Sequence, residues 1–141
     1  MAEIVIARVA VVDDELVAAW AHLMPQLSVH AAAPSREQLA GIAGSQLVAR
    51  LDGQIVGALC LTVYRTPTGV QARVDDVVVD EATRGRGAGE ALMHAAIELA
   101  RAAGAKVVAL TSHPRREAAN RLYQRLGFVR RETNVYALAL G

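Results

Sequence analysis

The 141-residue sequence has few of the residues that mark several protein classes. Its single cysteine, Cys60, excludes a disulfide framework and a zinc site built from several cysteines. No apolar run approaches the roughly 20 residues that a membrane-spanning helix needs. The N-terminus lacks the basic segment and the long apolar segment of a signal peptide. These absences predict a cytoplasmic protein that does not work at a membrane.

The chain also lacks an excess of charge of either sign. Fifteen basic residues against 14 acidic residues give a net charge of +1, whereas a dedicated nucleic-acid binder usually has a basic excess. We therefore expect no nucleic-acid partner. Hydrophobic residues make up 53% of the chain, enough for a core, and the length suits one domain over residues 1–141.

Candidate reactive side chains are sparse. Cys60 lies in the apolar run 58–61, which favours a buried, inert thiol over a nucleophile. His30 and His113 are interpreted as loop residues, with contact to a substrate as the alternative. No set of histidine, cysteine and carboxylate residues has the spacing of a metal site, so no metal is expected.

Hydrophobic periodicity predicts strands that alternate with helices. Strands are expected at residues 3–9, 46–51, 54–64, 73–79, 106–111, 128–131 and 134–140. Helices are expected after Asp13 or Asp14, after Ser35, between the glycine-rich turn and Gly104, and from Arg115 to Leu126. Pro25 should end or kink the first helix, and Asp52-Gly53 is a two-residue hairpin signal. The mixed order predicts an α/β (α+β) domain with a mixed central sheet of about seven strands and helices on both faces.

The glycine-rich segment 84–89 is the strongest local feature. It lies between an expected strand and an expected helix, where backbone N–H groups have no partner within the helix and carry partial positive charge. Glycines let a bulky anion approach the backbone, and Arg84 and Arg86 add charge, so a phosphate or diphosphate suits the turn. A tight turn without a ligand is the alternative. The segment lacks the Lys-Ser/Thr pair of a Walker motif, and its glycine spacing does not match the dinucleotide fingerprint.

Two segments together carry a family resemblance. Residues 76–80 read Asp-Val-Val-Val-Asp and precede Arg-Gly-Arg-Gly-Ala-Gly at residues 84–89, and residues 120–128 contain Asn-x-x-Tyr followed by Gly-Phe. This pair resembles the signature of the GNAT acetyltransferase superfamily. The order of the expected elements also fits, so the resemblance covers nearly the whole chain.

The resemblance implies acetyl-CoA as cosubstrate, with its diphosphate on the glycine turn and its pantetheine arm along the preceding strand. The cofactor-binding positions that it implies are Val77, Val78, Val79, Arg84, Gly85, Arg86, Gly87, Ala88, Gly89, Glu90 and Asn120. A solvent-exposed helix residue is the alternative for Asn120.

The resemblance also implies catalytic roles. Tyr123 is expected to donate a proton to the departing CoA thiolate, and packing at the edge of the core is its alternative. A phenol suits that step because its pKa of about 10 is near that of an alkyl thiol. Asp75 is the candidate base for the acceptor amine, directly or through water, and a structural or ion-pair role is its alternative. Asp75 and Asp76 are adjacent, so they should point to opposite faces of a regular strand.

The expected function is therefore transfer of an acetyl group to a primary amine of a small molecule or peptide, by direct attack in a ternary complex. A non-catalytic acyl-CoA-binding or regulatory domain is the alternative. The resemblance also suggests a homodimer through the C-terminal strands. The acceptor is not encoded clearly, because the sequence offers acidic and basic candidates for its recognition. These are Asp75, Asp76 and Glu132 on one side and Arg115, Arg116, Arg130 and Arg131 on the other.

Overall fold

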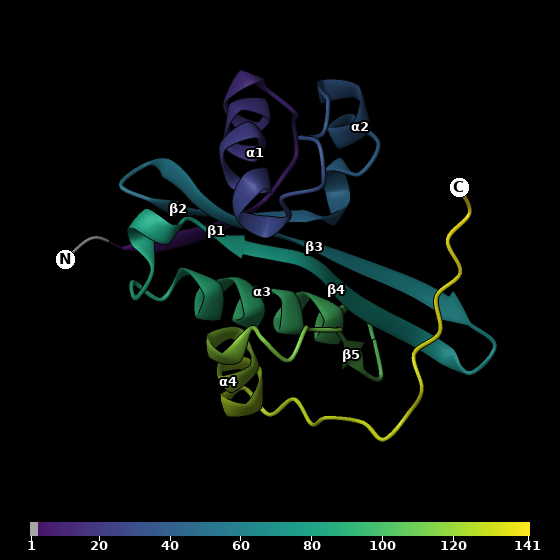
Figure 1. The fold of residues 1–141 in the computed structure, drawn as a ribbon. Helices are drawn as coiled ribbons and strands as arrows, with labels where there is room; N and C mark the ends of the chain where they lie inside the picture. Colours follow the sequence, from purple (N-terminus) through teal and green to yellow (C-terminus); the bar gives the residue numbers. More distant parts are fainter. Residues whose placement is uncertain (1–2) are drawn as a thin grey trace. The chain divides into compact units, whose positions relative to one another are not determined.

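Five strands form one mixed sheet in the computed structural model, which describes residues 3–141 (Figure 1). The strands are β1 (Ile4–Arg8), β2 (Gln46–Leu51), β3 (Gln54–Thr66), β4 (Gly69–Val79) and β5 (Val108–Ala109). They lie in the order β1-β2-β3-β4-β5, antiparallel except for the parallel pair β4 and β5. The sheet belongs to the first of two units of the chain, Met1–Thr111, and the second unit is Ser112–Gly141.

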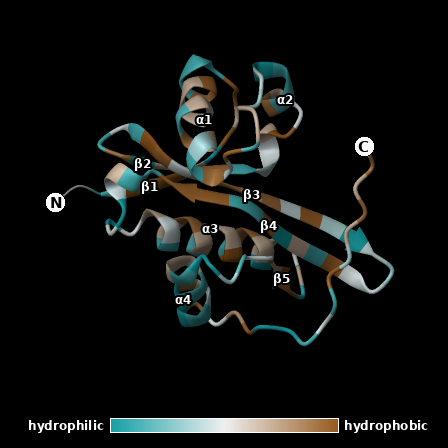
Figure 2. Cartoon of the chain, viewed as in Figure 1, coloured by the Kyte–Doolittle hydropathy of each residue, from teal (hydrophilic) through white to brown (hydrophobic). Residues whose placement is uncertain are grey.

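Helices cover both faces of this sheet. Helices α1 (Asp14–Leu27) and α2 (Arg36–Ala40) lie on one face, and α3 (Ala88–Ala102) lies on the other (Figure 1). Figure 2 shows the strands at their most hydrophobic where they pass between these helices. The core under α1 and α2 consists of Val9, Leu16, Trp20, Leu23, Leu39, Val48, Ala58 and Val78. The expected α/β class with a mixed sheet and helices on both faces is confirmed.

Local signals read from the sequence explain several helix and strand ends. The Asp13 side chain accepts a hydrogen bond from the Leu16 backbone and begins α1. The capping box of Ser35 and Gln38 is present at the start of α2. Asp52 and Gly53 join β2 and β3 with φ values of +51° and +79°, as a type I′ turn requires. Helix α1 continues past Pro25 and ends at Leu27, slightly beyond the expected break.

The second unit contains one helix, α4 (Glu117–Arg125), with a glycine-dependent end. Gly127 has a φ of +100°, the Phe128 backbone donates to the Tyr123 carbonyl over 3.0 Å, and the Gly127 backbone donates to the Gln124 carbonyl over 3.1 Å. These two bonds form a Schellman motif, which satisfies carbonyls that the helix leaves open.

The prediction of about seven strands is wrong. Residues 128–131 and 134–140 form no strand, and of the expected strand at 106–111 only Val108 and Ala109 pair, with Ala72 and Arg73 of β4. An alternating pattern gives a segment the propensity for a strand, but a strand exists only where a neighbour takes its backbone hydrogen bonds. Large hydrophobic side chains of this C-terminal segment are exposed instead. They are Val129, Val135, Tyr136, Leu138 and Leu140.

Lys106, the one lysine of the sequence, lies against the turn between β3 and β4. Its Nζ donates a hydrogen bond to the Thr68 carbonyl over 2.7 Å. A Cβ added at Gly69, where φ is +132°, would come within 2.8 Å of the Lys106 Cε. The positive φ of Gly69 favours glycine at this position, and a side chain there would displace the end of the Lys106 side chain.

Candidate functional site

The glycine turn connects β4 to α3 through a short 3₁₀ helix, η2 (Glu81–Thr83). Gly85 and Gly87 have φ values of +82° and +87°, so both use the left-handed conformation that glycine adopts without strain. Gly87 is the N-cap of α3 and has no side chain to accept from the first N–H groups of the helix. A Cβ at Gly85 or Gly87 would meet no heavy atom within 4 Å, so the space over the turn is open. An open helix N-terminus of this kind fits a phosphate or diphosphate.

Charged side chains flank the turn. Arg84 and Arg86 are exposed, and the Arg84 guanidinium lies 3.9 Å from the Glu81 carboxylate. Ala88 is buried in the first turn of α3, Gly89 is half-buried, and the exposed Glu90 lies 3.9 Å from His94. Both arginines thus place exposed positive charge on the turn that leads into the helix N-terminus.

A β-bulge interrupts β4 just before the turn. Cys60 pairs with Asp75 and Ala58 pairs with Val78, so Asp76 and Val77 together face Leu59 of β3. Asp76 has a φ of +54°, which is unusual for a residue other than glycine. The bulge breaks the regular alternation expected for Asp75 and Asp76. Val77 is the second residue of the bulge, and Val78 and Val79 follow it as the last residues of β4.

The carboxylate of Asp75 forms an ion pair with the guanidinium of Arg73. Its Oδ1 accepts a hydrogen bond from Arg73 Nε over 3.1 Å, and both side chains are 40% exposed. The Arg73 guanidinium also reaches Thr111. A role as proton acceptor would therefore fall to Oδ2 of Asp75. Beside it, burial raises the pKa of the half-buried Cys60 thiol, so this side chain stays protonated at neutral pH.

Asn120 and Tyr123 lie one turn apart on α4, in the second unit. The Asn120 side chain donates to the His113 carbonyl over 3.0 Å. Tyr123 is 5% exposed, and its ring meets that of Phe128 edge to face at a centroid distance of 6.0 Å. Burial raises the pKa of Tyr123, while the charge and hydrogen bond of Arg116 act in the opposite direction. The phenol therefore holds its proton at neutral pH, as a proton donor must.

The candidate residues from the sequence thus divide between the two units. Asp75, Val77–Val79 and the glycine turn follow one another along β4, η2 and α3, whereas Asn120 and Tyr123 lie on α4. Sequence reasoning missed His22 and Gln26 of α1, which contact Asp80 at the end of β4. Their spacing of four residues on one helix face was visible, but their distant partner was not. Within residues 3–141, no group of three or more histidine, cysteine or acidic residues could hold a metal ion, and no helix is long and apolar enough to cross a membrane.

The fold and the turn together agree with a sequence comparison. The model of the acetyltransferase (GNAT) family matches residues 9–128. The chain therefore belongs to the GNAT acetyltransferase family, whose members use acetyl-CoA. A search of curated proteins found no match.

Solved structures of acetyltransferases share the fold. An acetyltransferase from Trypanosoma brucei is 26% identical, with a TM-score of 0.68 over 99% of this chain and 100% of that chain. The aminoglycoside N-acetyltransferase AAC(6')-Iy, solved in complex with CoA, is 19% identical, with a TM-score of 0.77 over 100% of this chain and 97% of that chain. A ribosomal-protein-alanine N-acetyltransferase from Brucella melitensis biovar Abortus 2308 is 20% identical, with a TM-score of 0.71 over the full length of both chains.

Proposed function

We propose that this chain is an N-acetyltransferase, a single domain over residues 1–141 that moves the acetyl group of acetyl-CoA to a primary amine of a small molecule or peptide. The observation that carries the proposal is the open glycine turn at the uncapped N-terminus of α3, in a chain of the GNAT family. This arrangement suits the diphosphate of CoA because unpaired N–H groups and the helix dipole favour a bound anion.

The residues around the turn fit the rest of the cofactor in this proposal. The backbone of the segment Arg84–Glu90 binds the diphosphate, and the arginines at its start add positive charge. Val77 in the β4 bulge, with Val78 and Val79 after it, offers backbone groups to the pantetheine arm. Asn120 contacts that arm from α4. The open space over Gly85 and Gly87 supports these assignments, because no side chain covers the backbone where the diphosphate would approach.

Acetyl-CoA supplies the acetyl group as a thioester, and the residues of the chain move the protons. The acceptor amine attacks the thioester directly, without an acyl-enzyme. Asp75 accepts the proton of the amine, directly or through a water, because an ammonium group has no lone pair with which to attack. The backbone N–H of Val78 or a neighbour polarises the carbonyl. Tyr123, buried and protonated, donates its proton to the departing thiolate.

A cationic amine is the acceptor class that we propose. Asp75 and Asp76 lie partly or fully exposed at the β4 bulge, and the unit that contains them has 12 acidic against nine basic residues. A carboxylate pair raises the local concentration of cations. The structural neighbour AAC(6')-Iy, an aminoglycoside N-acetyltransferase by name, fits this proposal.

Release of free CoA over a panel of amines tests the function. The panel contains aminoglycosides, linear polyamines, an acidic amino acid and peptides with free N-termini, and the wild-type chain is compared with the Tyr123→Phe variant. We expect the wild type to turn over a cationic amine and the Tyr123→Phe variant to lose most of this activity. Binding of CoA without turnover on any amine would instead favour the non-catalytic acyl-CoA-binding domain. Turnover restricted to the acidic acceptors would overturn the proposed acceptor class.

A homodimer and a cytoplasmic location also stay predictions. The observation behind the dimer is the segment from Val129 to Leu140, in which Val135 and Leu138 are 75% and 84% exposed. Exposed apolar residues that lie close together along the chain commonly mark a protein–protein interaction surface. Light scattering after size exclusion should give twice the chain mass for the wild type and the chain mass for a Val135→Asp, Leu138→Asp variant. A monomeric wild type would contradict the dimer.

A further inference from the structure

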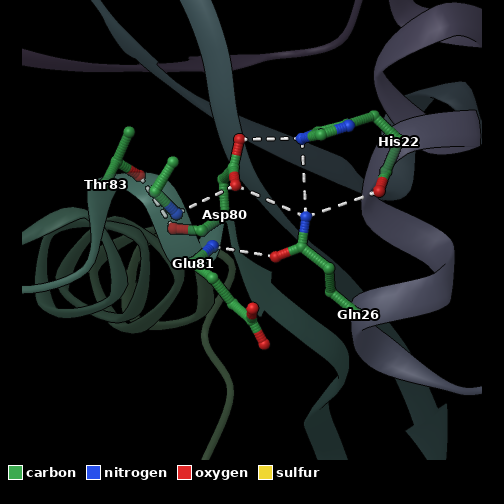
Figure 3. Close-up of polar contacts among 6 residues, drawn as sticks. His22, Gln26, Asp80, Glu81 and Thr83 are labelled. Atoms are coloured by element: carbon green, nitrogen blue, oxygen red, sulfur yellow. Dashed lines mark hydrogen bonds and ion pairs between the residues drawn. The ribbon is translucent and has the colours of Figure 1, made fainter.

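Two side chains of α1 contact the end of β4, directly before the glycine turn (Figure 3). His22 Nε2 lies 3.0 Å from Asp80 Oδ2, and Gln26 Nε2 donates to Asp80 Oδ1 over 3.4 Å. The Asp80 side chain is only 16% exposed, whereas that of His22 is 64% exposed. The two α1 residues thus both contact the carboxylate of Asp80, which is largely buried, and His22 itself is mostly exposed to solvent.

The same contacts reach the backbone of η2. Gln26 Oε1 accepts a hydrogen bond from the Glu81 backbone over 2.8 Å, so its amide bridges two consecutive residues. Asp80 Oδ1 also accepts from the Ala82 backbone over 3.1 Å, and its carbonyl accepts from the Thr83 hydroxyl over 3.0 Å. The Ala82 N–H, then His22 and Gln26, lower the pKa of Asp80, which keeps the carboxylate charged. Three backbone residues before Arg84 are therefore fixed by this network.

The glycine turn depends on such fixed ends. It holds two glycines in the left-handed conformation, and glycine has more conformational freedom than any other residue. The backbone hydrogen bonds at its ends run from Arg84 N to the Glu81 carbonyl over 3.4 Å and from Ala91 N to the Gly87 carbonyl over 3.0 Å. The first of these bonds is long. The direction of the chain as it enters the turn is therefore set mainly by η2.

Helix α1 is itself firmly placed. Trp20 is buried, and its Nε1 donates over 2.9 Å to Oε1 of Gln46, which is 1% exposed. The Gln46 side chain also donates to the Leu39 carbonyl of α2. A buried amide with both ends satisfied fixes the helix relative to the sheet. Because His22 and Gln26 follow Trp20 by about half a turn and about one and a half turns, they project from a rigid support.

We propose that His22 and Gln26 are positioning residues for the cofactor. They hold Asp80 and η2 so that the N–H groups of the glycine turn face the diphosphate before CoA binds, although neither residue touches CoA. This inference rests on the proposed function, since it assumes that the turn binds CoA. The apparent dissociation constant of a ligand rises in inverse proportion to the binding-competent fraction of the protein. If loss of both side chains leaves the turn competent in about one molecule in ten, affinity falls about tenfold.

The test compares Gln26→Ala, His22→Ala and the double variant with the wild type. Arg101→Ala is the matched control, because Arg101 is 66% exposed and also lies beside a carboxylate, that of Glu98 at 3.1 Å, outside the glycine turn. Titration calorimetry gives the dissociation constant of CoA, thermal unfolding gives the stability, and hydrogen exchange reports on the backbone of residues 81–88. We expect about tenfold weaker CoA binding for the double variant, which equals about 1.4 kcal/mol. Exchange at residues 81–88 should be faster in the free variant and return to the wild-type rate with saturating CoA.

The outcomes separate this inference from the proposed function. A wild type that binds no CoA overturns both. A wild type that binds CoA, with a double variant that binds equally well, overturns the positioning role alone. A double variant with a lower melting temperature but unchanged affinity and exchange shows that the cluster only anchors α1, and it also overturns the role.

A second variant covers the case in which the double variant fails to fold. In Gln26→Glu, Oε1 can still accept from the Glu81 backbone, but the second oxygen repels Asp80 in place of donating to it. Weaker CoA binding with folding retained supports the positioning role. Unchanged affinity in this variant contradicts it.

Discussion

In residues 1–111 the proposed functional groups belong mainly to the main chain, whereas in residues 112–141 they belong to side chains. The first unit offers two left-handed glycines, a bulge and a helix N-terminus. The second offers the phenol of Tyr123 and the amide of Asn120 on one helix. Their charges differ too, because residues 112–141 carry six arginines against two glutamates, while residues 1–111 have an acidic excess.

This difference predicts which measured constant, cofactor affinity or reaction rate, a substitution in each unit should change. Main-chain groups bind an anion in the ground state, so changes in the first unit should alter cofactor affinity. A proton donor acts when the leaving group takes on charge, so changes at Tyr123 should alter the rate.

The largest expected effect tests the side-chain half of this comparison. Tyr123→Phe keeps the buried ring and its contact with Phe128 but removes the hydroxyl, so kcat should fall by about 10²- to 10⁴-fold. CoA affinity should stay within about twofold, because the proton is needed only in the transition state. The matched control is Tyr64→Phe, at a tyrosine on β3 that is 45% exposed. Steady-state kinetics with an active amine give kcat, and titration calorimetry gives the dissociation constant of CoA.

The pH profile sharpens the same test. Because burial raises the pKa of Tyr123, the wild-type rate should hold up to the ordinary tyrosine value of about 10 before it declines. Tyr123→Phe should lose that decline at high pH. A variant that keeps more than about half of the wild-type kcat, with chemistry limiting, would show that Tyr123 is not the acid.

A change at the glycine turn tests the main-chain half. Gly87→Glu puts a side chain and a negative charge into the open space over the turn, so CoA should bind at least about tenfold more weakly. Gly53→Glu is the matched control, because Gly53 also has a positive φ, of +79°, and open space around it. Both variants have similar backbone strain, and only Gly87→Glu should change the calorimetric affinity. Equal affinities in two folded variants would disprove the assignment of the turn.

A smaller effect is expected at Asp75. Asp75→Asn should lower kcat/KM by about tenfold at neutral pH, where a carboxylate base is ionised, should remove the acidic limb of the pH profile, and should leave CoA affinity unchanged. The effect is limited because Arg73 already engages Oδ1 of this carboxylate. A pH–rate profile of wild type and variant checks the prediction. If the variant keeps the acidic limb, Asp75 is not the base, and its role is the structural ion pair with Arg73.

The smallest effect concerns stability. The pKa of Asp80 lies below its ordinary value of 3.8, so the charged carboxylate stabilises the fold above that pH, and this contribution is lost as the pH falls through the lowered pKa. Asp80→Asn should therefore lower the melting temperature at pH 7 by about 2–4 °C and make less difference near pH 3. Asp52→Asn, at an exposed aspartate of the hairpin turn, is the control. An Asp80→Asn effect that is the same at both pH values would contradict the electrostatic account.

What the sequence could predict was local. The helix start after Ser35, the Asp52-Gly53 hairpin and the glycine turn each depend on residues within a few positions, and all three are present in the structure. The bulge at Asp76 was not predictable, because an aspartate in the left-handed conformation has no glycine to mark it. Contacts of His22 with Asp80 join positions 58 residues apart, which no local pattern encodes.

The C-terminal segment shows the limit of strand propensity. Residues 135–140 are an unbroken apolar run that was expected to form a strand, yet the segment from Asn134 onward has no ladder in the structure. The residues of a segment set its propensity for a strand, but the segment forms a strand only where a neighbouring strand pairs with its backbone. The candidate roles of Tyr123 and Asn120 came from the motif at residues 120–128, which covers the end of α4 and does not depend on these expected strands.

Because Lys106 is the one lysine of the sequence, acetylation of the protein's own lysine side chains adds little signal to an assay of acetyl transfer. Every other long basic side chain is an arginine, which an acetyl thioester does not acetylate under ordinary conditions, and the single lysine amine is engaged with the Thr68 carbonyl. Self-modification of lysine can therefore add only one acetyl group to the mass of the intact chain. Intact-mass spectra recorded during turnover can read acceptor acetylation with the enzyme as an internal standard, and a Lys106→Arg variant would remove even that signal.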